Sequence, residues 1–266
     1  MARTAGLLNL MEDVMDERTA LGELVRMSAW LGRPENDFVI LGEGNTSARA
    51  GDDIFYVKES GKYLSQSDET IFVKVKLSEA LALLDAGELS DTEIKDALFA
   101  ACADPDNKKR PSIETTFHGF LLTLPDVNFV GHTHPVAVNS LMCSVNVEKV
   151  LSNRIFPDEI VYCGIEPIVM EYFDPGLGLA QTIRKKCNAY IDKHGLPPKV
   201  IVIKNHGLIA LGKNAHEVEA VTSMFCKTCR VLLGATQFGG VHYMSAENVD
   251  RIYTRPDEHY RKQQFH

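Results

Sequence analysis

Two short apolar segments that each end in histidine constrain the fold of this chain more than any other feature. The segment "VNFVGHTH" carries His132 and His134, and the segment "KVIVIKNHG", far downstream, carries His206 directly after its apolar residues. Short apolar runs bounded by turn residues are typical of buried strands. Because alternate residues of a strand face the same side, His132 and His134 project from one face. If the two strands are neighbours in a sheet, the three imidazoles converge.

The rest of the chain mixes helical and strand patterns without a strict alternation of the two. We expect helices over residues 16–32, 77–87, 90–104, 113–124, 135–144, 176–195 and 214–235. We expect strands over residues 37–51, 52–61, 127–134, 159–165 and 167–172, and a strand, a turn and a second strand over 199–212. This order predicts an α/β or α+β sandwich with a mostly antiparallel sheet between helices.

Composition places the chain among ordinary globular proteins. Of its 266 residues, 45% are apolar and 24% are charged, and a chain of this length buries roughly 70–75% of its unfolded surface. Such a core needs neither disulfides nor a metal ion, so a bound metal would serve chemistry. The net charge of −8 comes without a clustered stripe of lysine and arginine, which excludes the usual nucleic-acid-binding classes.

Nothing in the sequence indicates export or insertion into a membrane. No apolar run approaches the roughly 20 residues of a membrane helix, and acidic residues soon interrupt the apolar patch at the N-terminus. Cys226 and Cys229 have redox spacing, but they fall within a helical pattern and lack a second pair, so we interpret them as buried thiols. We therefore expect a cytoplasmic protein with reduced cysteines and with neither membrane nor nucleic-acid partners.

The histidine pattern favours a catalytic metal centre over a structural one. An isolated H-x-H pair is more often structural than metal-binding, but a third histidine in a similar strand-and-turn setting strengthens the metal interpretation. Three imidazoles leave one or two coordination positions open, as in catalytic zinc sites. Glu114 lies four residues before His118 in an expected helix. A carboxylate beside a metal is a natural base, although a solvated glutamate and an ordinary buried histidine would explain the same pair.

The glycine-rich segment "GEGNTSAR" does not have the spacing of a dinucleotide loop. Ser47 occupies the place of the third glycine, and no helix clearly follows. Two interpretations remain for this segment. It is either a tight turn in a hairpin, or a nest of backbone N–H groups and an amide that holds an oxyanion.

Taken together, "PSIETTFH", "GHTHP", "NHG" and the upstream "GEGNTSAR" resemble the class II aldolase/adducin family. The resemblance extends from about residue 20 to residue 235. It implies a three-layer α/β/α sandwich with a mostly antiparallel central sheet, formed by a single domain over residues 1–266 with a C-terminal tail at 241–266. It also implies a homotetramer.

The resemblance also implies the metal and its ligands. A divalent metal, usually zinc, would be held by His132, His134 and His206, and Glu114 would be the catalytic acidic residue. The adducin branch of the family lacks these histidines. Because this chain keeps all three, a metal-free assembly protein is the less favoured alternative.

Phosphate binding is implied by the fuculose-phosphate branch of the family for three segments, Gly44-Asn45, Ser60-Gly61 and Ser112-Ile113. The chain departs from that branch at two positions. Ser60 replaces a threonine and keeps a hydroxyl, whereas Ile113 replaces a serine and loses one. Lys58 adds a charge nearby. The implied partner is a small-molecule sugar phosphate.

The family includes fuculose-phosphate and rhamnulose-phosphate aldolases, ribulose-phosphate 4-epimerases and sugar-phosphate dehydratases. Glutamate at the position of Glu114 is usual in the aldolases and dehydratases, whereas the epimerases usually carry aspartate. We therefore expect a lyase that cleaves a ketose 1-phosphate or related hydroxy-ketone sugar by a retro-aldol reaction, with the metal stabilising the enediolate. A dehydratase or 4-epimerase is the alternative. A C-terminal tyrosine of a neighbouring subunit would protonate the leaving oxygen, the candidates being Tyr243, Tyr253 and Tyr260.

Overall fold

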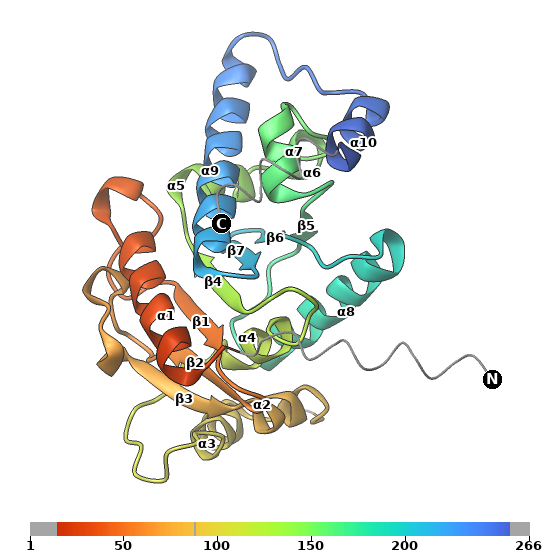
Figure 1. The fold of residues 1–266 in the computed structure, drawn as a ribbon. Coiled ribbons are helices and arrows are strands. Elements are labelled where there is room, and N and C mark those ends of the chain that lie inside the picture. The colour runs from red at the N-terminus through yellow and green to blue at the C-terminus, as the bar shows by residue number, and fades with distance from the viewer. Residues whose placement is uncertain (1–14, 88, 256–266) are drawn as a thin grey trace, which may run out of the picture.

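A seven-stranded sheet organises residues 15–87 and 89–255, the part of the chain that the computed structural model describes (Figure 1). The strands follow the order β3-β2-β1-β4-β7-β6-β5 across the sheet. Neighbouring strands are antiparallel except for β5 and β6, which are parallel. The mostly antiparallel sheet that the sequence predicted is therefore confirmed.

The sheet strands are β1 (Asn45–Arg49), β2 (Ile54–Lys58), β3 (Phe72–Lys76), β4 (Phe129–Thr133), β5 (Ile168–Met170), β6 (Val200–Ile203) and β7 (Gly207–Gly212). The helices are α1 (Glu17–Leu31), α2 (Leu77–Leu84), α3 (Asp91–Ala100), α4 (Thr115–Leu121), α5 (Val136–Met142), α6 (Val147–Val150), α7 (Pro157–Cys163), α8 (Leu177–His194), α9 (Ala215–Gln237) and α10 (Ala246–Thr254). Within the described ranges, no helix has both the length and the apolar character needed to cross a bilayer.

Helices cover both faces of the sheet because strand side chains alternate between two apolar clusters. In β6, Val200 and Val202 pack into the cluster that includes α1, α5 and α9. Ile201 and Ile203 pack into the opposite cluster, which includes α2, α4 and α8. All four side chains are fully buried, and a continuous apolar strand of this kind is typical of a sheet buried on both faces. The three-layer α/β/α sandwich is confirmed.

The central strands bring the two histidine segments together. β4 pairs with β7, with His132 opposite Ile209, and the turn between β6 and β7 carries His206. The apolar run before His206 is therefore not the direct neighbour of β4, because β7 lies between them. On its other edge, β4 pairs with β1, with Asn45 opposite His132. The start of β1, the end of β4 and the turn between β6 and β7 thus meet at the same edge of the sheet, although they are far apart in the sequence.

Local signals in the sequence set most helix ends where they were predicted. Asp16 accepts hydrogen bonds from two backbone N–H groups at the start of α1, and Asn214 accepts one from the Glu217 N–H at the start of α9. Ser90 and Glu93 form the predicted capping box of α3. Gly195 ends α8 with a left-handed φ of 73°.

Residues 159–165 are wrongly predicted as a strand, because most of them lie in α7. Proline at the first helical position and acidic residues in the first turn are signals of a helix start. A short apolar run alone does not distinguish a strand from a buried helix. The Glu159 carboxylate is also paired with the buried Arg154 guanidinium at 2.7 Å, a contact that the sequence pattern did not reveal.

Several other elements differ from the prediction. The strand expected over 37–51 is shortened to β1, because the segment before it turns, with Asp37 and Leu41 at positive φ. Strand β3 and helices α6 and α10 were not predicted. Glu114 lies at the N-cap of α4 and outside the helix itself, so it does not share a helical face with His118.

Replacement of Gly44 tests the close backbone contact between the start of β1 and the end of β4. Its φ is 69°, and a Cβ would lie 2.7 Å from the backbone oxygen of His132. We expect Gly44→Ala to lose more stability than the ~1–2 kcal/mol of left-handed strain alone, measured by urea unfolding. Gly51→Ala is the matched control, because Gly51 has a φ of 77° and nothing within 4 Å. Equal losses would show that the contact with His132 is not the constraint.

Candidate functional site

Three histidine rings meet where β4 ends and the turn between β6 and β7 passes over it. The Nε2 atom of His132 lies 3.1 Å from Nε2 of His134 and 3.2 Å from Nε2 of His206. The ring centroids of the three pairs lie 4.8, 4.9 and 5.1 Å apart. The structure thus brings together the three histidines that the sequence pattern singled out.

Close contact between the two segments depends on glycine at position 207. A Cβ on Gly207 would lie 2.6 Å from the backbone oxygen of Thr133 and 2.7 Å from Cδ2 of His134. The left-handed residue of the turn is Asn205, with a φ of 57°. Gly207 is therefore needed for the close approach of the strands, and it lets His206 reach the other two rings.

Two of the rings are oriented by hydrogen bonds at their Nδ1 atoms. His132 Nδ1 donates to the backbone oxygen of Leu208 at 3.0 Å, and His134 Nδ1 donates to the Glu43 carboxylate at 3.1 Å. With Nδ1 protonated in each ring, the Nε2 atoms carry lone pairs and face one another. Burial lowers the pKa of His132 well below its ordinary value and that of His206 to about 4, so both rings are neutral at neutral pH.

The donor set and its spacing fit a divalent metal ion. Nitrogens at 2.0–2.1 Å from a tetrahedral zinc lie roughly 3.3 Å from one another, close to the observed Nε2 separations of 3.1 and 3.2 Å. Facing lone pairs at this distance repel each other unless a proton or a cation lies between them. Among residues 15–87 and 89–255, these histidines are the one group of histidine, cysteine and acidic side chains arranged to hold a metal.

Glu114 stands beside the three rings. Its Oε2 atom lies 3.5 Å from Nε2 of His132, and its Oε1 atom lies 3.6 Å from Nε2 of His206. The side chain is buried, and Oε1 has no hydrogen-bond partner among the described residues. Burial raises the pKa of Glu114 to about 7, although the hydrogen bond from Asn45 and the charge of Lys58 lower it. A carboxyl with these properties can both give and accept a proton near neutral pH.

A buried chain of hydrogen bonds holds the Glu114 carboxylate in place. Asn45 Nδ2 donates to Glu114 Oε2 at 2.7 Å and to Ser112 Oγ at 3.0 Å. His118 Nε2 donates to Asn45 Oδ1, and His118 Nδ1 accepts from Ser47 Oγ at 2.7 Å. Burial lowers the pKa of His118 to about 3, so the neutral ring donates on one side and accepts on the other. The chain fixes the Asn45 amide and, through it, the carboxylate.

The three segments implied to bind phosphate line one cavity together with His134, His206 and Glu114. The cavity has a volume of about 210 Å³, and its lining also includes Gly42, Gly44, Asn45, Lys58, Ser60, Gly61, Ser112, Ile113 and Pro175. Both N–H groups of the Asn45 amide are used within the protein, so this amide has no donor left for a phosphate. The Ser112 hydroxyl oxygen accepts two hydrogen bonds, which leaves its hydrogen free to donate into the cavity.

Lys58 is almost completely buried at the same cavity. Its Nζ atom donates to the backbone oxygens of Gly42 at 3.1 Å and Lys62 at 2.5 Å. Burial lowers the pKa of Lys58 to about 8, against the charge of Glu114, which raises it. Two of the three N–H donors are thus used, and the third is available to an anion in the cavity.

Sequence patterns missed two parts of the site. Glu43, which orients His134, lies inside the "GEGNTSAR" segment, but nothing in that segment indicates that its carboxylate faces a histidine. Pro175 reaches the cavity from the loop before α8. In both cases the signal is tertiary, because it depends on how distant segments pack.

Tyr243, Tyr253, Cys226 and Cys229 do not line the cavity of their own chain. The Tyr243 hydroxyl donates to the backbone oxygens of Lys149 and Val150, and Tyr253 packs against α7 and α10 residues. Tyr260 lies outside the described residues. Cys226 and Cys229 are buried free thiols, and burial raises the pKa of both, which disfavours a reactive thiolate.

Comparison with known proteins places this fold and site in a family. The model of the Class II Aldolase and Adducin N-terminal domain matches residues 22–233. The chain therefore belongs to the class II aldolase and adducin family. Members of that family are often lyases, but they include epimerases and decarboxylases.

Solved structures share the fold across most of their length. The N-terminal class II aldolase domain of a conserved protein from Thermoplasma acidophilum is 25% identical, with a TM-score of 0.63 and coverage of 88% of this chain and 97% of that one. An L-fuculose 1-phosphate aldolase is 15% identical, with a TM-score of 0.66 and coverage of 92% and 100%. YgbL from Klebsiella pneumoniae, for which aldolase, epimerase and decarboxylase are given as alternative activities, is 20% identical, with a TM-score of 0.66 and coverage of 90% and 99%.

A curated relative is much longer than this chain. The uncharacterised oxidoreductase YuxG of Bacillus subtilis (strain 168) is 26% identical over an alignment of 205 residues that covers 74% of this chain. The chain spans about a quarter of the length of that relative, 26%. The similarity therefore concerns one part of YuxG.

Removal of one histidine tests whether the three rings bind a metal. We expect His134→Ala to lose most of its zinc affinity and still to fold, because a large core does not depend on a metal. Zinc titration with a competing chelator, together with thermal unfolding, measures both properties. His216→Ala is the control, since its side chain is 53% exposed and lies outside the histidine group. Unchanged zinc affinity in His134→Ala, or its failure to fold, would contradict this prediction.

Proposed function

We propose that the protein is a metal-dependent lyase that cleaves a ketose 1-phosphate or a related hydroxy-ketone sugar by a retro-aldol reaction. One observation carries the proposal: the buried, unpartnered Oε1 of Glu114 lies 3.6 Å from Nε2 of His206, beside three converging imidazoles. Cleavage of a C–C bond next to a carbonyl requires a group that moves a proton at carbon and a neighbouring centre that stabilises negative charge.

His132, His134 and His206 are the proposed ligands of a zinc ion, because imidazole nitrogens are among the donors that zinc prefers. A bound zinc would supply Lewis-acid stabilisation of the negative charge that C–C cleavage leaves on the ketone fragment. Glu43 and the Leu208 carbonyl would keep two of the ligands in the required tautomer.

Glu114 is the proposed acid–base residue. In the cleavage direction, the hydroxyl beside the breaking bond loses its proton, the aldehyde forms, and the electron pair of the C–C bond passes to the ketone fragment. The protonated Glu114 then gives its proton to the carbon of that fragment. Asn45 and His118 hold the carboxyl in position for this transfer. The phenolate of a C-terminal tyrosine from a neighbouring subunit is the proposed acceptor of the hydroxyl proton, with Tyr243, Tyr253 and Tyr260 as the candidates.

The substrate phosphate is proposed to lie in the same cavity. The donors that support this placement are the hydroxyls of Ser60 and Ser112, the backbone at Gly44 and Gly61, and the remaining N–H of Lys58. The family resemblance further supports two proposals, that residues 1–266 form a single domain and that the chain assembles as a homotetramer.

Incubation with candidate ketose phosphates tests the proposed reaction. We expect release of an aldehyde, detected by coupled reduction with NADH, together with dihydroxyacetone phosphate. A changed stereocentre without cleavage would identify an epimerase, and loss of water would identify a dehydratase. A chain that binds no zinc and alters none of these sugars would favour a metal-free assembly role.

Replacement of the acid–base residue separates chemistry from metal binding. We expect Glu114→Gln to keep its zinc and to lose turnover by about 10²–10⁴-fold, the usual contribution of general acid–base catalysis. The amide keeps the size of the side chain and an oxygen that can accept the hydrogen bond from Asn45. Steady-state kinetics and metal analysis of the same sample measure the two effects. Glu148→Gln is the control, because Glu148 is exposed and pairs with Lys204 at 2.9 Å, away from the cavity lining. Full turnover in Glu114→Gln would remove Glu114 from the mechanism.

A further inference from the structure

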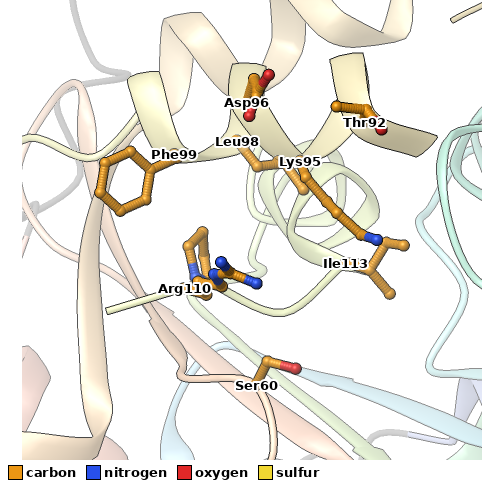
Figure 2. Close-up of a pocket in the computed structure, with 9 residues that line it drawn as sticks. Ser60, Thr92, Lys95, Asp96, Leu98, Phe99, Arg110 and Ile113 are labelled. Carbon is orange, nitrogen blue, oxygen red and sulfur yellow. The ribbon is translucent and has the colours of Figure 1, made fainter. Parts of the chain in front are cut away.

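A second pocket of about 490 Å³ opens beside the candidate site, between α3 and the segment before α4 (Figure 2). Ser60 and Ile113 line both this pocket and the cavity that contains the histidines. The remaining lining residues are Thr92, Lys95, Asp96, Leu98, Phe99, Arg110 and Pro111. The pocket and the cavity are therefore neighbours, with Ser60 and Ile113 between them.

The wall between the cavity and the pocket is held by the backbone. The Ser60 N–H donates to the Arg110 oxygen at 2.9 Å, and the Ser112 N–H donates to the Lys58 oxygen at 3.3 Å. Glu59 and Pro111 also form an isolated β-bridge between the same segments. These bonds fix the base of the Arg110 side chain relative to the site.

Two cationic side chains of the pocket have no partner in the part of the chain that the structure describes. Figure 2 shows the Arg110 guanidinium between α3 and Ser60, and the Lys95 side chain running from α3 toward Ile113. Neither cation forms a hydrogen bond or an ion pair through its side chain with a described residue. Asp96 is the one acidic residue in the lining, so the pocket has two positive charges against one negative charge.

The inner cavity is poorer in anion donors than the family pattern implies. Ile113 stands where the second serine of that pattern would supply a hydroxyl, and the Asn45 amide is fully used by Ser112 and Glu114. Ile113 also lines the outer pocket. The apolar side chain thus separates an inner region with few donors from an outer region with two free cations.

We infer that this outer pocket binds an anionic oxygen group of the substrate, a phosphate or a carboxylate, through Arg110 and Lys95. The inference rests on the proposed function in taking the anion to be part of the substrate, and it adds Arg110 and Lys95, on the outer side of Ser60 and Ile113, to the donors proposed for that group. A guanidinium presents paired donors that match the oxygens of either group. The hydroxyls of Ser60 and Thr92 can complete the set, and Ile113 contacts the carbon chain that joins the anion to the reacting atoms.

Anion binding to the full chain tests this inference without any turnover. Isothermal titration at low ionic strength measures the Kd of inorganic phosphate and, separately, of acetate, which distinguishes the two kinds of anion. We expect Arg110→Gln and Lys95→Gln each to weaken binding of the preferred anion by about ten-fold or more, the usual effect of a lost charge-assisted hydrogen bond. Lys108→Gln is the matched control, because Lys108 is an exposed cation of the same segment that does not line the pocket.

Two results would overturn the inference. One is wild-type affinity in Arg110→Gln and Lys95→Gln, with a loss only in Lys58→Met, which would place the anion in the inner cavity. The other is no binding of either anion. Both results differ from a failure of the proposed lyase activity. If the protein is not a lyase, it releases no aldehyde, but its anion binding is still weakened by Arg110→Gln and Lys95→Gln.

Kinetics add a second measurement if a substrate is found. We expect Arg110→Gln to raise KM for the anionic sugar by about ten-fold with little change in kcat, because the lost contact is present in both the ground state and the transition state. KM for the uncharged sugar should stay the same. An equal rise in KM for both sugars would show that Arg110 does not recognise the anion.

Discussion

The register of β4 against its two neighbours is the constraint on which the site depends. Pairing with β7 places His132 opposite Ile209, and pairing with β1 places it opposite Asn45. A shift of one residue would turn His132 and His134 to the other face of the sheet. Glycines at positions 44 and 207 allow the close contacts that this register requires. The three histidine rings therefore converge because the sheet is fully paired around them.

Burial then determines what these groups can do chemically. Imidazoles removed from water stay neutral and keep lone pairs available, and a carboxyl removed from water titrates near neutral pH. Most polar groups around the site are satisfied by the chain through Ser47, His118 and Asn45. Oε1 of Glu114 and Nδ1 of His206 are left without partners among the described residues. An unpaired buried polar atom costs about 1–3 kcal/mol, and such costs concentrate at functional sites.

Local chemistry explains which elements could be predicted and which could not. Helix ends with a side-chain cap or a glycine, as at Ser90 and Gly195, were placed well because a few adjacent residues determine them. Residues 159–165 were misassigned because a short apolar run fits both a strand and a buried helix, and the pairing of Glu159 with Arg154 that accompanies the helix is tertiary. The three histidines were recognised from their pattern, whereas the role of Glu43 depends on a fold that brings residue 43 to His134.

The sequence by itself determined the residue types of the site, the alternation that buries the sheet on both faces, and the family to which the chain belongs. These are properties of neighbouring residues and of short motifs, so they can be read along the chain. The tertiary structure decided that the Asn45 amide is used internally, that Glu114 lies before its helix, and that Ile113 separates two cavities. Each of these three features depends on distances between segments that are remote in sequence. Side-chain packing and backbone pairing fix those distances only when the whole sheet has formed.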